Sequence, residues 1–234
     1  MISKSFLLES VSDLFALCAS LSVLFGLYKY LHEFRDLFVD VIYYCVSIFI
    51  LWHLHCIISQ QLIKVWSPKV DPKNKAIFIT GCDTGFGHSF AKRLSSIGFH
   101  VFAGCLNPSC KGADKLSLLK NITVVELDVT KETSVNGCYD VVQEQLSKRG
   151  LTLHGVVNNA GVAEGTGIEL SNFEHFNKTF SVNIQGYALV AKTFIPLLRK
   201  NEGSRLINIG SISSQSGFVF AGGYSASKVL QVAI

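Results

Sequence analysis

Apolar residues follow two different patterns along this chain of 234 residues. Before about residue 67 they form long runs, and after it they form short runs separated by amphipathic stretches. The run Val41–Ile58 holds eighteen residues without a formal charge. At about 1.5 Å per residue, a helix of that length spans about 27 Å, close to the roughly 30 Å hydrocarbon core of a bilayer. The pattern therefore predicts a membrane-spanning helix over residues 41–63.

An earlier apolar run, Leu14–Tyr28, is fifteen residues long and begins beside Asp13. It fits a second span over residues 14–31, an interfacial segment or a signal-anchor. A cleaved signal peptide fits less well because a longer apolar run follows. A buried core helix is the alternative for the later run, but such helices are usually shorter. We therefore expect a membrane anchor over residues 1–66 and a linker over residues 67–75.

The charges around the later apolar run bear on orientation. Four lysines follow the run and outnumber the cations before it, namely Lys64, Lys69, Lys73 and Lys75. The positive-inside bias then places the folded domain in the cytosol. The sequons at Asn121 and Asn177 would matter only in a lumenal domain, and chance explains both.

From Lys75 onwards, short apolar runs alternate with helical patterns. The predicted strands are Lys75–Thr80, Phe99–Cys105, Thr123–Leu127, Gly155–Asn158 and Arg205–Ile209. The predicted helices begin at His88 and then cover Lys111–Leu119, Lys131–Lys148 and Glu174–Arg199. Strands that alternate with helices indicate a parallel sheet covered on both faces. We therefore predict an α/β, Rossmann-like doubly wound domain over residues 76–234.

Composition excludes several classes of function. The chain is 49% hydrophobic and 16% charged, against about 25% charged in soluble domains, and the apolar excess lies in the first 66 residues. The net charge of +4 comes without a basic block, which argues against nucleic-acid binding. Seven cysteines without a CxxC motif indicate reduced thiols. His53 and His55 point to different faces of a helix, so we predict no metal site.

A glycine-rich turn follows the first predicted strand. Lys75–Thr80 runs into Gly81-Cys-Asp-Thr-Gly-Phe-Gly87, and a helical pattern begins next. This arrangement lets the backbone approach a pyrophosphate at a helix N-terminus. The spacing is GxxxGxG rather than GxGxxG, and a glycine turn after a strand is often only a turn.

A second motif lies near the C-terminus. Tyr224 and Lys228 are four residues apart, with Ser211 thirteen residues before the tyrosine. Residues at i and i+4 share one face of a helix, so the ammonium reaches the neighbourhood of the phenol. A phenol has a pKa near 10, and a nearby positive charge favours the phenolate. The spacing of Tyr224 and Lys228 alone is weak evidence for a catalytic pair, because it recurs by chance in many helices. Together with the glycine loop, it predicts a proton-transfer group for alcohol and ketone chemistry.

From about Lys75 onwards the chain resembles the short-chain dehydrogenases/reductases. The residues Thr80–Gly87 match the TGxxxGxG cofactor loop, Asp128 and Val129 match the element that contacts adenine, and Asn158–Gly161 match the NNAG element. Each segment alone could be an ordinary turn or strand end, but all three match the family motifs in the family's order. The resemblance implies a cofactor site made by Thr80, Gly81, Asp83, Thr84, Gly85, Phe86, Gly87, Asp128, Val129, Asn158, Asn159, Ala160, Gly161, Tyr224 and Lys228.

The resemblance also implies a catalytic tetrad of Asn183, Ser211, Tyr224 and Lys228. In such a tetrad Tyr224 exchanges the hydroxyl proton, and Lys228 lowers its pKa and bonds the nicotinamide ribose. Ser211 holds the substrate oxygen, and Asn183 seats a water of the proton relay. The implied reaction is hydride transfer between a nicotinamide cofactor and an alcohol or ketone.

Within the family, three segments resemble the branch that holds microsomal retinol dehydrogenases, type 2 hydroxysteroid dehydrogenases and 3-hydroxybutyrate dehydrogenase: Gly81–Gly87, Val101–Leu106 and Phe194–Arg199. The predicted anchor favours the steroid and retinoid members. The resemblance thus implies a lipophilic alcohol or ketone as substrate, a membrane location in the endoplasmic reticulum, and homodimers as a possible assembly.

The cofactor choice depends on the residues after the second predicted strand. An acidic side chain there binds the ribose 2′-hydroxyl, whereas an arginine accommodates a 2′-phosphate. Ala103-Gly104-Cys105 supplies neither, and the glycine loop holds no basic residue. We therefore expect NAD rather than NADP, and an NADPH-dependent lipid-ketone reductase stays as an alternative.

Members of the family continue well beyond the position of Ile234, through further strands and the substrate loop. The resemblance therefore implies an incomplete domain at the C-terminus, with an exposed sheet edge. A catalytically inactive family member or a regulatory fragment is the alternative to a working enzyme.

Overall fold

The computed structural model describes residues 18, 20, 35–66 and 70–233. The chain divides into two compact units, Met1–Lys69 and Val70–Ile234. The predicted linker over residues 67–75 contains their boundary, and its first three residues lie outside the described part.

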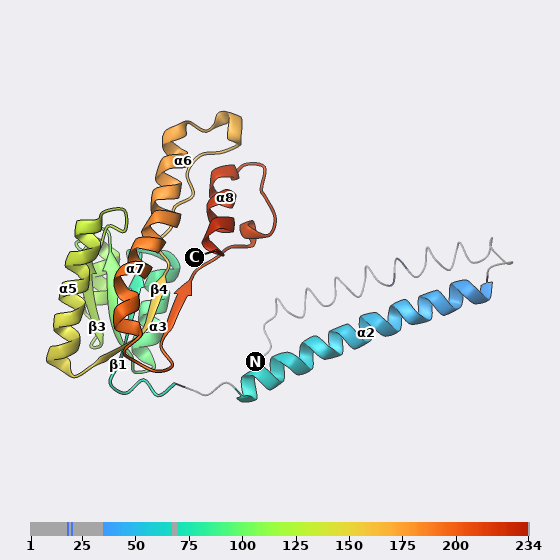
Figure 1. Cartoon of the computed structure of the whole chain (residues 1–234), viewed down its shortest axis with the longest axis horizontal. Coiled ribbons are helices and arrows are strands. Elements are labelled where there is room, and N and C mark those ends of the chain that lie inside the picture. The colour runs from blue at the N-terminus through green and yellow to red at the C-terminus, as the bar shows by residue number, and fades with distance from the viewer. Residues whose placement is uncertain (1–17, 19, 21–34, 67–69, 234) are drawn as a thin grey trace. The chain divides into compact units, whose positions relative to one another are not determined.

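In the first unit the structure describes one long helix, α2 (Arg35–Trp66), drawn in blue in Figure 1. Within it, Val39–Leu62 is 24 residues long with a mean hydropathy of 2.0, and none of its most apolar window is buried. By length and composition this segment can cross a membrane. It starts slightly before the predicted span of residues 41–63. The possible second span over residues 14–31 lies outside the described residues, apart from residues 18 and 20.

The second unit is built on a five-stranded sheet in the order β3-β2-β1-β4-β5, with every neighbouring pair parallel. The chain fills one half of the sheet with its first three strands and then crosses to the other side of β1. Ligands bind at such a switch point, beyond the carboxyl ends of the strands. The strands are β1 (Lys75–Thr80), β2 (His100–Cys105), β3 (Ile122–Glu126), β4 (Thr152–Asn158) and β5 (Arg205–Asn208).

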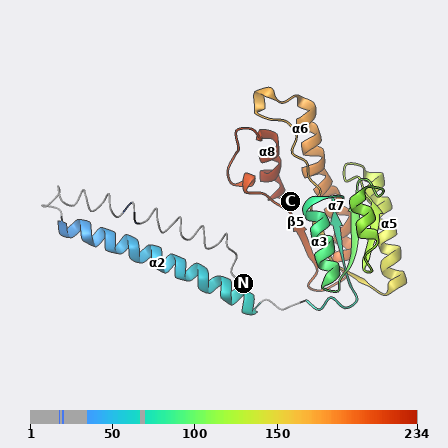
Figure 2. The same cartoon turned by 180° about the vertical axis from the view of Figure 1, so that it is seen from behind.

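Helices connect the strands and cover both faces of the sheet, as the two opposite views in Figures 1 and 2 show. The α-helices of this unit are α3 (Gly85–Ser96), α4 (Lys111–Ser117), α5 (Glu132–Arg149), α6 (Phe173–Phe180), α7 (Tyr187–Leu198) and α8 (Gly222–Gln231). The shorter turns are the 3₁₀ segments η2 (Ile168–Leu170) and η4 (Ile212–Ser214) and the π-helical segment η3 (Ser181–Gly186).

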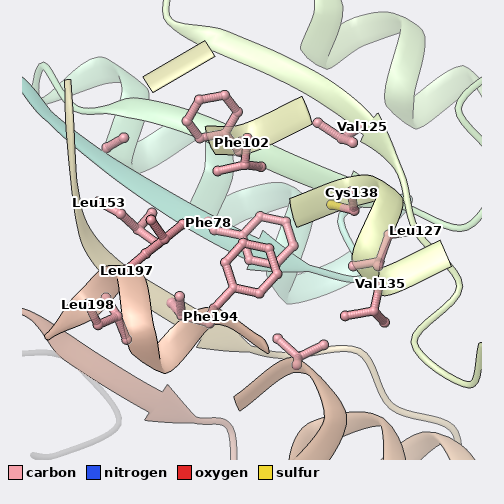
Figure 3. Packing of buried hydrophobic residues seen from close by; sticks show 14 of the residues in the cluster. Phe78, Phe102, Val125, Leu127, Val135, Cys138, Leu153, Phe194, Leu197 and Leu198 are labelled. Atoms are coloured by element: carbon pink, nitrogen blue, oxygen red, sulfur yellow. The ribbon is translucent and has the colours of Figure 1, made fainter. Parts of the chain in front are cut away.

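Each face of the sheet has its own apolar core, because successive strand residues point to opposite sides. Phe78 of β1 faces α5 and α7, where its ring stacks on Phe194 with 4.4 Å between ring centres. Figure 3 shows this pair at the centre of the cluster. The neighbouring Ile77 and Ile79 belong to the opposite core, beneath α3 and α4. Residues buried on both faces explain why the strands read as continuous apolar runs.

The predicted doubly wound fold is therefore confirmed, with corrections to three elements. The chain expected to be helical over Glu174–Arg199 is helical from Phe173 to Leu198, but its middle segment, η3, is π-helical and divides it into α6 and α7. The helix expected from His88 begins at Gly85, inside the glycine loop. The strand expected at Gly155 begins at Thr152, because its first residues pair with Lys75 and Ala76 of β1 although the sequence there is only partly apolar.

Candidate active site

The glycine loop after β1 is built by close backbone contacts that exclude side chains. Gly81 has a φ of +70°, and a Cβ there would lie 2.7 Å from the Ala160 Cα. A Cβ at Gly87 would lie 2.3 Å from the Gly81 carbonyl oxygen. Only glycine fits at these two positions, because L-residues avoid positive φ and atoms cannot overlap.

Helix α3 opens directly from this loop with its positive end uncovered. Thr84 is the N-cap residue, its side chain makes no capping hydrogen bond, and no acidic residue lies in the first turn. The first N–H groups of a helix have no intrahelical acceptor, and the helix dipole favours an anion beside them. The N-terminus of α3 therefore has the form of a phosphate-binding site.

Asp83 links the glycine loop to the segment after β2. Its two carboxylate oxygens accept hydrogen bonds from the backbone N–H groups of Leu106, at 3.0 Å, and Asn107, at 2.9 Å. A Cβ at Gly112 of α4 would lie 1.9 Å from the Asp83 carbonyl oxygen, so α4 packs directly on this loop. The carboxylate thus lies at the end of β2, where a dinucleotide fold receives the adenosine ribose.

A cavity of about 540 Å³ lies beside this loop, at the carboxyl ends of β1 to β4. Ten of the residues expected to contact the cofactor line it: Gly81, Asp83, Thr84, Gly85, Phe86, Asp128, Val129, Asn159, Ala160 and Gly161. Its volume and its mixed apolar and polar lining suit an organic cofactor.

Sequence reasoning missed six further residues that line the cavity: Leu106, Leu127, Thr130, Val162, Lys178 and Val182. Leu106 follows the predicted second strand, Leu127 is the last residue of the predicted third strand, and Thr130 comes three residues later. The rule that parallel strand ends meet at one edge was a signal for them. Lys178 and Val182 lie just before Asn183 in the sequence, but no motif in the sequence pointed to them.

Two expected cofactor residues lie behind the wall of the cavity. Thr80 is fully buried, and its hydroxyl accepts hydrogen bonds from the backbone N–H groups of Asn159, at 3.0 Å, and Ala160, at 2.9 Å. Asn158 is also fully buried, and its amide donates to the Tyr187 carbonyl at 3.2 Å. Thr80 thus ties the end of β1 to the segment after β4, whereas Asn158 ties the end of β4 to α7 and, at 3.0 Å, to Asn208 of β5. Neither residue lines the cavity.

Asp128 brings a negative charge to the cavity. Partial burial raises the pKa of its carboxyl, but hydrogen bonds from Thr130, at 2.6 Å and 3.1 Å, and the Lys131 ammonium at 3.0 Å outweigh that effect. The net result is a pKa below the usual value, so the carboxylate is ionised at neutral pH.

Tyr224 and Lys228 lie on one face of α8, as their spacing predicts. The Lys228 Nζ is 5.6 Å from the centre of the Tyr224 ring and equally far from the centre of the Tyr187 ring. It donates a hydrogen bond to the Ile209 carbonyl at 2.8 Å. Lys228 is 4% exposed, and this burial lowers the pKa of its amine to about 8.

The cavity comes close to the Lys228 amine at Gly161. A Cβ at Gly161 would lie 3.9 Å from the Lys228 Nζ and 3.4 Å from the Asn183 Oδ1. A nucleotide that occupies the cavity therefore reaches the wall on which the Lys228 amine lies.

Asn183 lies in η3 and connects three segments. Its side chain accepts from the Val162 N–H and donates to the Val162 carbonyl, both at 2.9 Å. Its Nδ2 also donates to the Ser227 hydroxyl at 2.9 Å. The backbone carbonyl of Asn183 accepts a hydrogen bond of 2.6 Å from the side-chain amide of Gln231. Gln231 is a contact that sequence reasoning missed.

Ser211 follows β5 and is the N-cap residue of η4. Its hydroxyl donates to the Ser213 Oγ at 3.1 Å and accepts from the Ser213 N–H at the same distance. The side chain is half-buried, on the loop that leads from β5 towards α8. The structure thus brings the glycine loop and the cavity to the carboxyl edge of the sheet. Asn183, Tyr224 and Lys228 lie at the same edge, and Ser211 lies just after β5.

Comparison with known proteins decides the family. The model of the short chain dehydrogenase family matches residues 75–232, which is more than half of the chain. The chain belongs to the short chain dehydrogenase family. The expected membership of short-chain dehydrogenases/reductases is thereby confirmed.

Similar members of the short chain dehydrogenase family include steroid and hydroxybutyrate enzymes. The chain is 36% identical to bovine mitochondrial D-beta-hydroxybutyrate dehydrogenase over 170 residues, which cover 70% of this chain and 49% of that protein. It is 35% identical to human 17-beta-hydroxysteroid dehydrogenase type 2 over 194 residues, covering 82% of this chain and 47% of that protein. The chain thus spans about half the length of the curated relatives it matches. The resemblance to this branch of the family is confirmed.

A short chain dehydrogenase/reductase from Burkholderia phymatum, solved in complex with NAD, has a similar fold. The TM-score is 0.65 at 27% identity, and the match covers 70% of this chain and 59% of that one. The nicotinamide cofactors of short chain dehydrogenases suit the cradle formed here by Gly81, Gly87 and the uncovered end of α3.

Proposed function

We propose that the chain carries the cofactor site and the proton-transfer pair of an NAD(H)-dependent oxidoreductase that acts on a lipophilic alcohol or ketone. The observation that carries this proposal is the position of Lys228. Its buried amine lies against Gly161 on one side and one helical turn from Tyr224 on the other. A phosphate-binding helix end and a proton-transfer pair thus share one edge of the sheet.

The residues of the cavity suit the parts of a dinucleotide. The N–H groups at the start of α3 would hold the pyrophosphate, Asp83 and Leu106 would face the adenosine ribose, and Asp128 would face the adenine. Nicotinamide would supply hydride transfer, and this chain would supply position and electrostatics.

The proton is the part of the reaction that this chain handles. In the proposed scheme Tyr224 exchanges a proton with the substrate oxygen, as general base in oxidation and general acid in reduction. The Lys228 ammonium would place a positive charge beside this phenol, with 5.6 Å between its Nζ and the centre of the Tyr224 ring. The Ser211 hydroxyl would hold the substrate oxygen, and Asn183 would keep α8 in register with the loop at Val162.

The charge around the ribose end of the cavity favours NAD over NADP. Asp83 lines the cavity at the end of β2, whereas Asp128 pairs with Lys131 and the lysine on the cavity wall, Lys178, pairs with Glu164. A 2′-phosphate would meet the Asp83 carboxylate at close range, and like charges in a partly buried site repel strongly. The 2′-hydroxyl of NAD meets no such repulsion.

A lipophilic substrate and a membrane location are supported by α2 and by the relatives. None of the most apolar window of Val39–Leu62 is buried, and many of its large apolar side chains are exposed. Exposed apolar area of this extent is stable in a bilayer and unfavourable in water. A steroid-like or retinoid-like alcohol partitions into the same bilayer. We place the enzyme in the membrane of the endoplasmic reticulum with residues 76–234 in the cytosol.

Binding and turnover test this function separately. The purified full chain is titrated with NADH and with NADPH, and cofactor fluorescence is recorded. It is then incubated with NAD and a panel of steroids, retinol and 3-hydroxybutyrate. The proposal expects saturable NADH binding, weaker NADPH binding and turnover with an apolar alcohol. Binding without any turnover would identify the chain as an inactive or regulatory member, and a preference for NADPH would identify a reductase.

A further inference from the structure

A second pocket lies at the amino ends of the strands, at the opposite end of the sheet from the cofactor cavity. This amino-end pocket has a volume of about 210 Å³ and is lined by Pro72, Asn74, Lys75, Gly98, His100, Asn121, Arg149 and Leu151. Lys75 and His100 are the first residues of β1 and β2, and Arg149 is the last residue of α5. The pocket is smaller than the roughly 300–1,000 Å³ sites of organic ligands, and its size suits a small anion with its ester arm.

The charged groups of the amino-end pocket are basic. Among the described residues, no carboxylate lines it, and neither Lys75 nor Arg149 takes part in an ion pair. The Arg149 guanidinium donates to the neutral Gln145 side chain at 3.1 Å. The carboxylate of Asp71, which precedes Pro72, is exposed and accepts the Lys73 N–H at 3.0 Å. The pocket thus holds two cations without a counterion.

Two buried histidines are subject to the positive charge at this end of the sheet. His100 is 8% exposed, and burial, followed by the Arg149 guanidinium, lowers the pKa of its imidazole. His154 of β4 is equally buried, and burial, followed by Lys75 and Arg205, lowers its pKa. Cations from three different elements therefore act on this region together. An anion in the pocket would offset their mutual repulsion.

His100 gives the amino-end pocket a fixed polar side chain. Its Nε2 lies 3.0 Å from the Thr123 hydroxyl, and its ring lies edge-on to Phe102 with 4.9 Å between ring centres. These contacts hold the imidazole in one position on the pocket wall. A buried polar side chain beside a lysine and an arginine distinguishes this pocket from a solvated basic surface, where every polar group is exposed.

The amino-end pocket lies where the chain enters the folded unit. Pro72 follows Trp66, the last residue of α2, by six residues. A stretch of that length reaches at most about 20 Å. With α2 in a bilayer, as proposed above, Pro72 and the adjoining pocket stay close to the lipid headgroups. The cytoplasmic leaflet carries a negative surface potential that attracts basic residues next to a membrane helix.

We propose that the amino-end pocket binds the phosphate headgroup of an anionic phospholipid in the leaflet next to the folded unit. Arg149 would hold the phosphate oxygens with its planar guanidinium, Lys75 would add a second positive charge, and His100 would border the bound group from inside. A phosphomonoester, with about two negative charges near neutral pH, matches the two unpaired cations better than a diester. The inference rests on the proposed membrane location of α2 but not on the proposed chemistry.

Amine labelling of Lys75 tests this proposal. The full chain is reconstituted in nanodiscs of phosphatidylcholine with increasing phosphatidic acid, labelled briefly with acetic anhydride at one pH, and analysed by mass spectrometry. A phosphate bound in the pocket covers the Lys75 amine. Its labelling should therefore fall about tenfold when the phosphatidic acid content is about ten times the half-saturating value. Lys111, at the start of α4 and the other end of the sheet, is the internal reference.

Two further samples identify the source of the phosphate. Phosphatidylglycerol, at a content that gives the same surface charge, carries a diester and should protect Lys75 much less. Equal protection by the two lipids would overturn the inference in favour of general attraction to an anionic surface. Inorganic phosphate added to pure phosphatidylcholine nanodiscs should protect little. Protection equal to that by phosphatidic acid would identify a soluble anion as the ligand and also contradict the proposal.

Replacement of Arg149 locates the site. Arg149→Gln removes one of the two unpaired cations, so half-saturation should need at least about tenfold more phosphatidic acid. Arg199→Gln is the matched control, because it makes the same change just after α7 at a residue that does not line the pocket. Protection as in the wild type in an Arg149→Gln protein that is folded by circular dichroism would refute the site.

NADH titration of the same nanodiscs separates the two proposals. A chain that binds NADH but shows no protection of Lys75 contradicts only the lipid site. A chain whose Lys75 is protected but that binds no NADH contradicts only the proposed chemistry. A chain that does not enter nanodiscs contradicts the membrane location and the lipid site with it.

Discussion

The Lys228 amine lies 5.6 Å from the centre of the Tyr224 ring and is almost completely buried, with no carboxylate beside it among the described residues. A buried cation without a counterion destabilises a folded protein. Its presence at the edge of the sheet therefore points to a chemical role, since packing alone favours an apolar residue at this position.

Replacement of the proton-transfer phenol separates chemistry from binding. Tyr224→Phe removes one hydroxyl from a half-buried ring and keeps the ring in place. We expect turnover to fall by at least about 10²-fold, because general acid–base catalysis contributes that much. NADH affinity should stay near the wild-type value. Parallel loss of turnover, affinity and the folded circular dichroism spectrum would show a structural role instead.

Replacement of Lys228 by an apolar residue should raise the stability of the protein and abolish its activity. Burial lowers the pKa of its amine from an ordinary 10.5 to about 8. Below pH 8 the amine is charged in both the folded and the unfolded state, and the folded state bears the full cost of burying it. Lys228→Met removes this cost and one hydrogen bond, so it should increase the free energy of unfolding at pH 7 by about 2 kcal/mol.

That gain should shrink as the pH rises from 8 to about 10.5, because the amine then becomes neutral in both states. Thermal unfolding at pH 7 and pH 10 measures the difference, and turnover should be lost at both. A methionine variant that is less stable than the wild type at pH 7 would contradict this explanation of the pKa.

Glycine-to-alanine changes should have opposite effects in the glycine loop and in α5. Gly87→Ala places a Cβ 2.3 Å from the Gly81 carbonyl oxygen and should abolish NADH binding. Gly137→Ala lies in the middle of α5 with open space around the new Cβ, so it should stabilise the protein by about 0.5–1 kcal/mol. NADH titration and thermal unfolding of both variants test the pair. An NADH-binding Gly87→Ala protein would refute the cradle.

The charge of Asp83 should set the cofactor preference. Asp83→Asn removes the charge and keeps one oxygen that can accept from the segment after β2. The ratio of NADPH to NADH affinity should rise by about tenfold or more. Asp114→Asn, an exposed neutralisation in the first turn of α4, should leave the ratio unchanged. An unchanged ratio of NADPH to NADH affinity in Asp83→Asn would show that Asp83 does not determine the cofactor preference.

Stability should fall in mild acid because of two buried histidines. Burial, with smaller effects from nearby cations, lowers the pKa of His100 and His154 below the usual value. Such groups contribute fully above the unfolded pKa of about 6.5, and this contribution is lost as the pH falls through their folded pKa values. Melting temperatures between pH 7.5 and pH 5 should decline, and less steeply in His100→Asn and His154→Asn. Equal slopes in all three proteins would contradict this assignment.

Local sequence patterns predicted the sheet well because each strand is buried on both faces. Phe78 and Ile79 belong to different cores, and both had to be apolar. The strand at Thr152 was predicted too short because its beginning is fixed by pairing with Lys75, which is a contact far along the chain.

The motifs predicted which residues surround the site but not how each one acts. Thr80 and Asn158 belong to recognisable motifs, yet they lie behind the cavity wall, where Thr80 joins β1 to the segment after β4 and Asn158 joins β4 to β5. Asp83 was expected to contact the cofactor, but its place at the end of β2 follows only from the folded loop. Gln231 belongs to no motif, and its contact with Asn183 depends on the π turn that interrupts a helix of otherwise regular pattern.

Fluorescence titration of the purified full-length chain with NADH tests the central claim most directly. A nucleotide in the cavity beside Gly161 and Lys228 should show enhanced, blue-shifted emission that saturates, and Gly87→Ala should abolish the signal. A chain that is folded by circular dichroism and shows no saturable change with either NADH or NADPH would contradict the account.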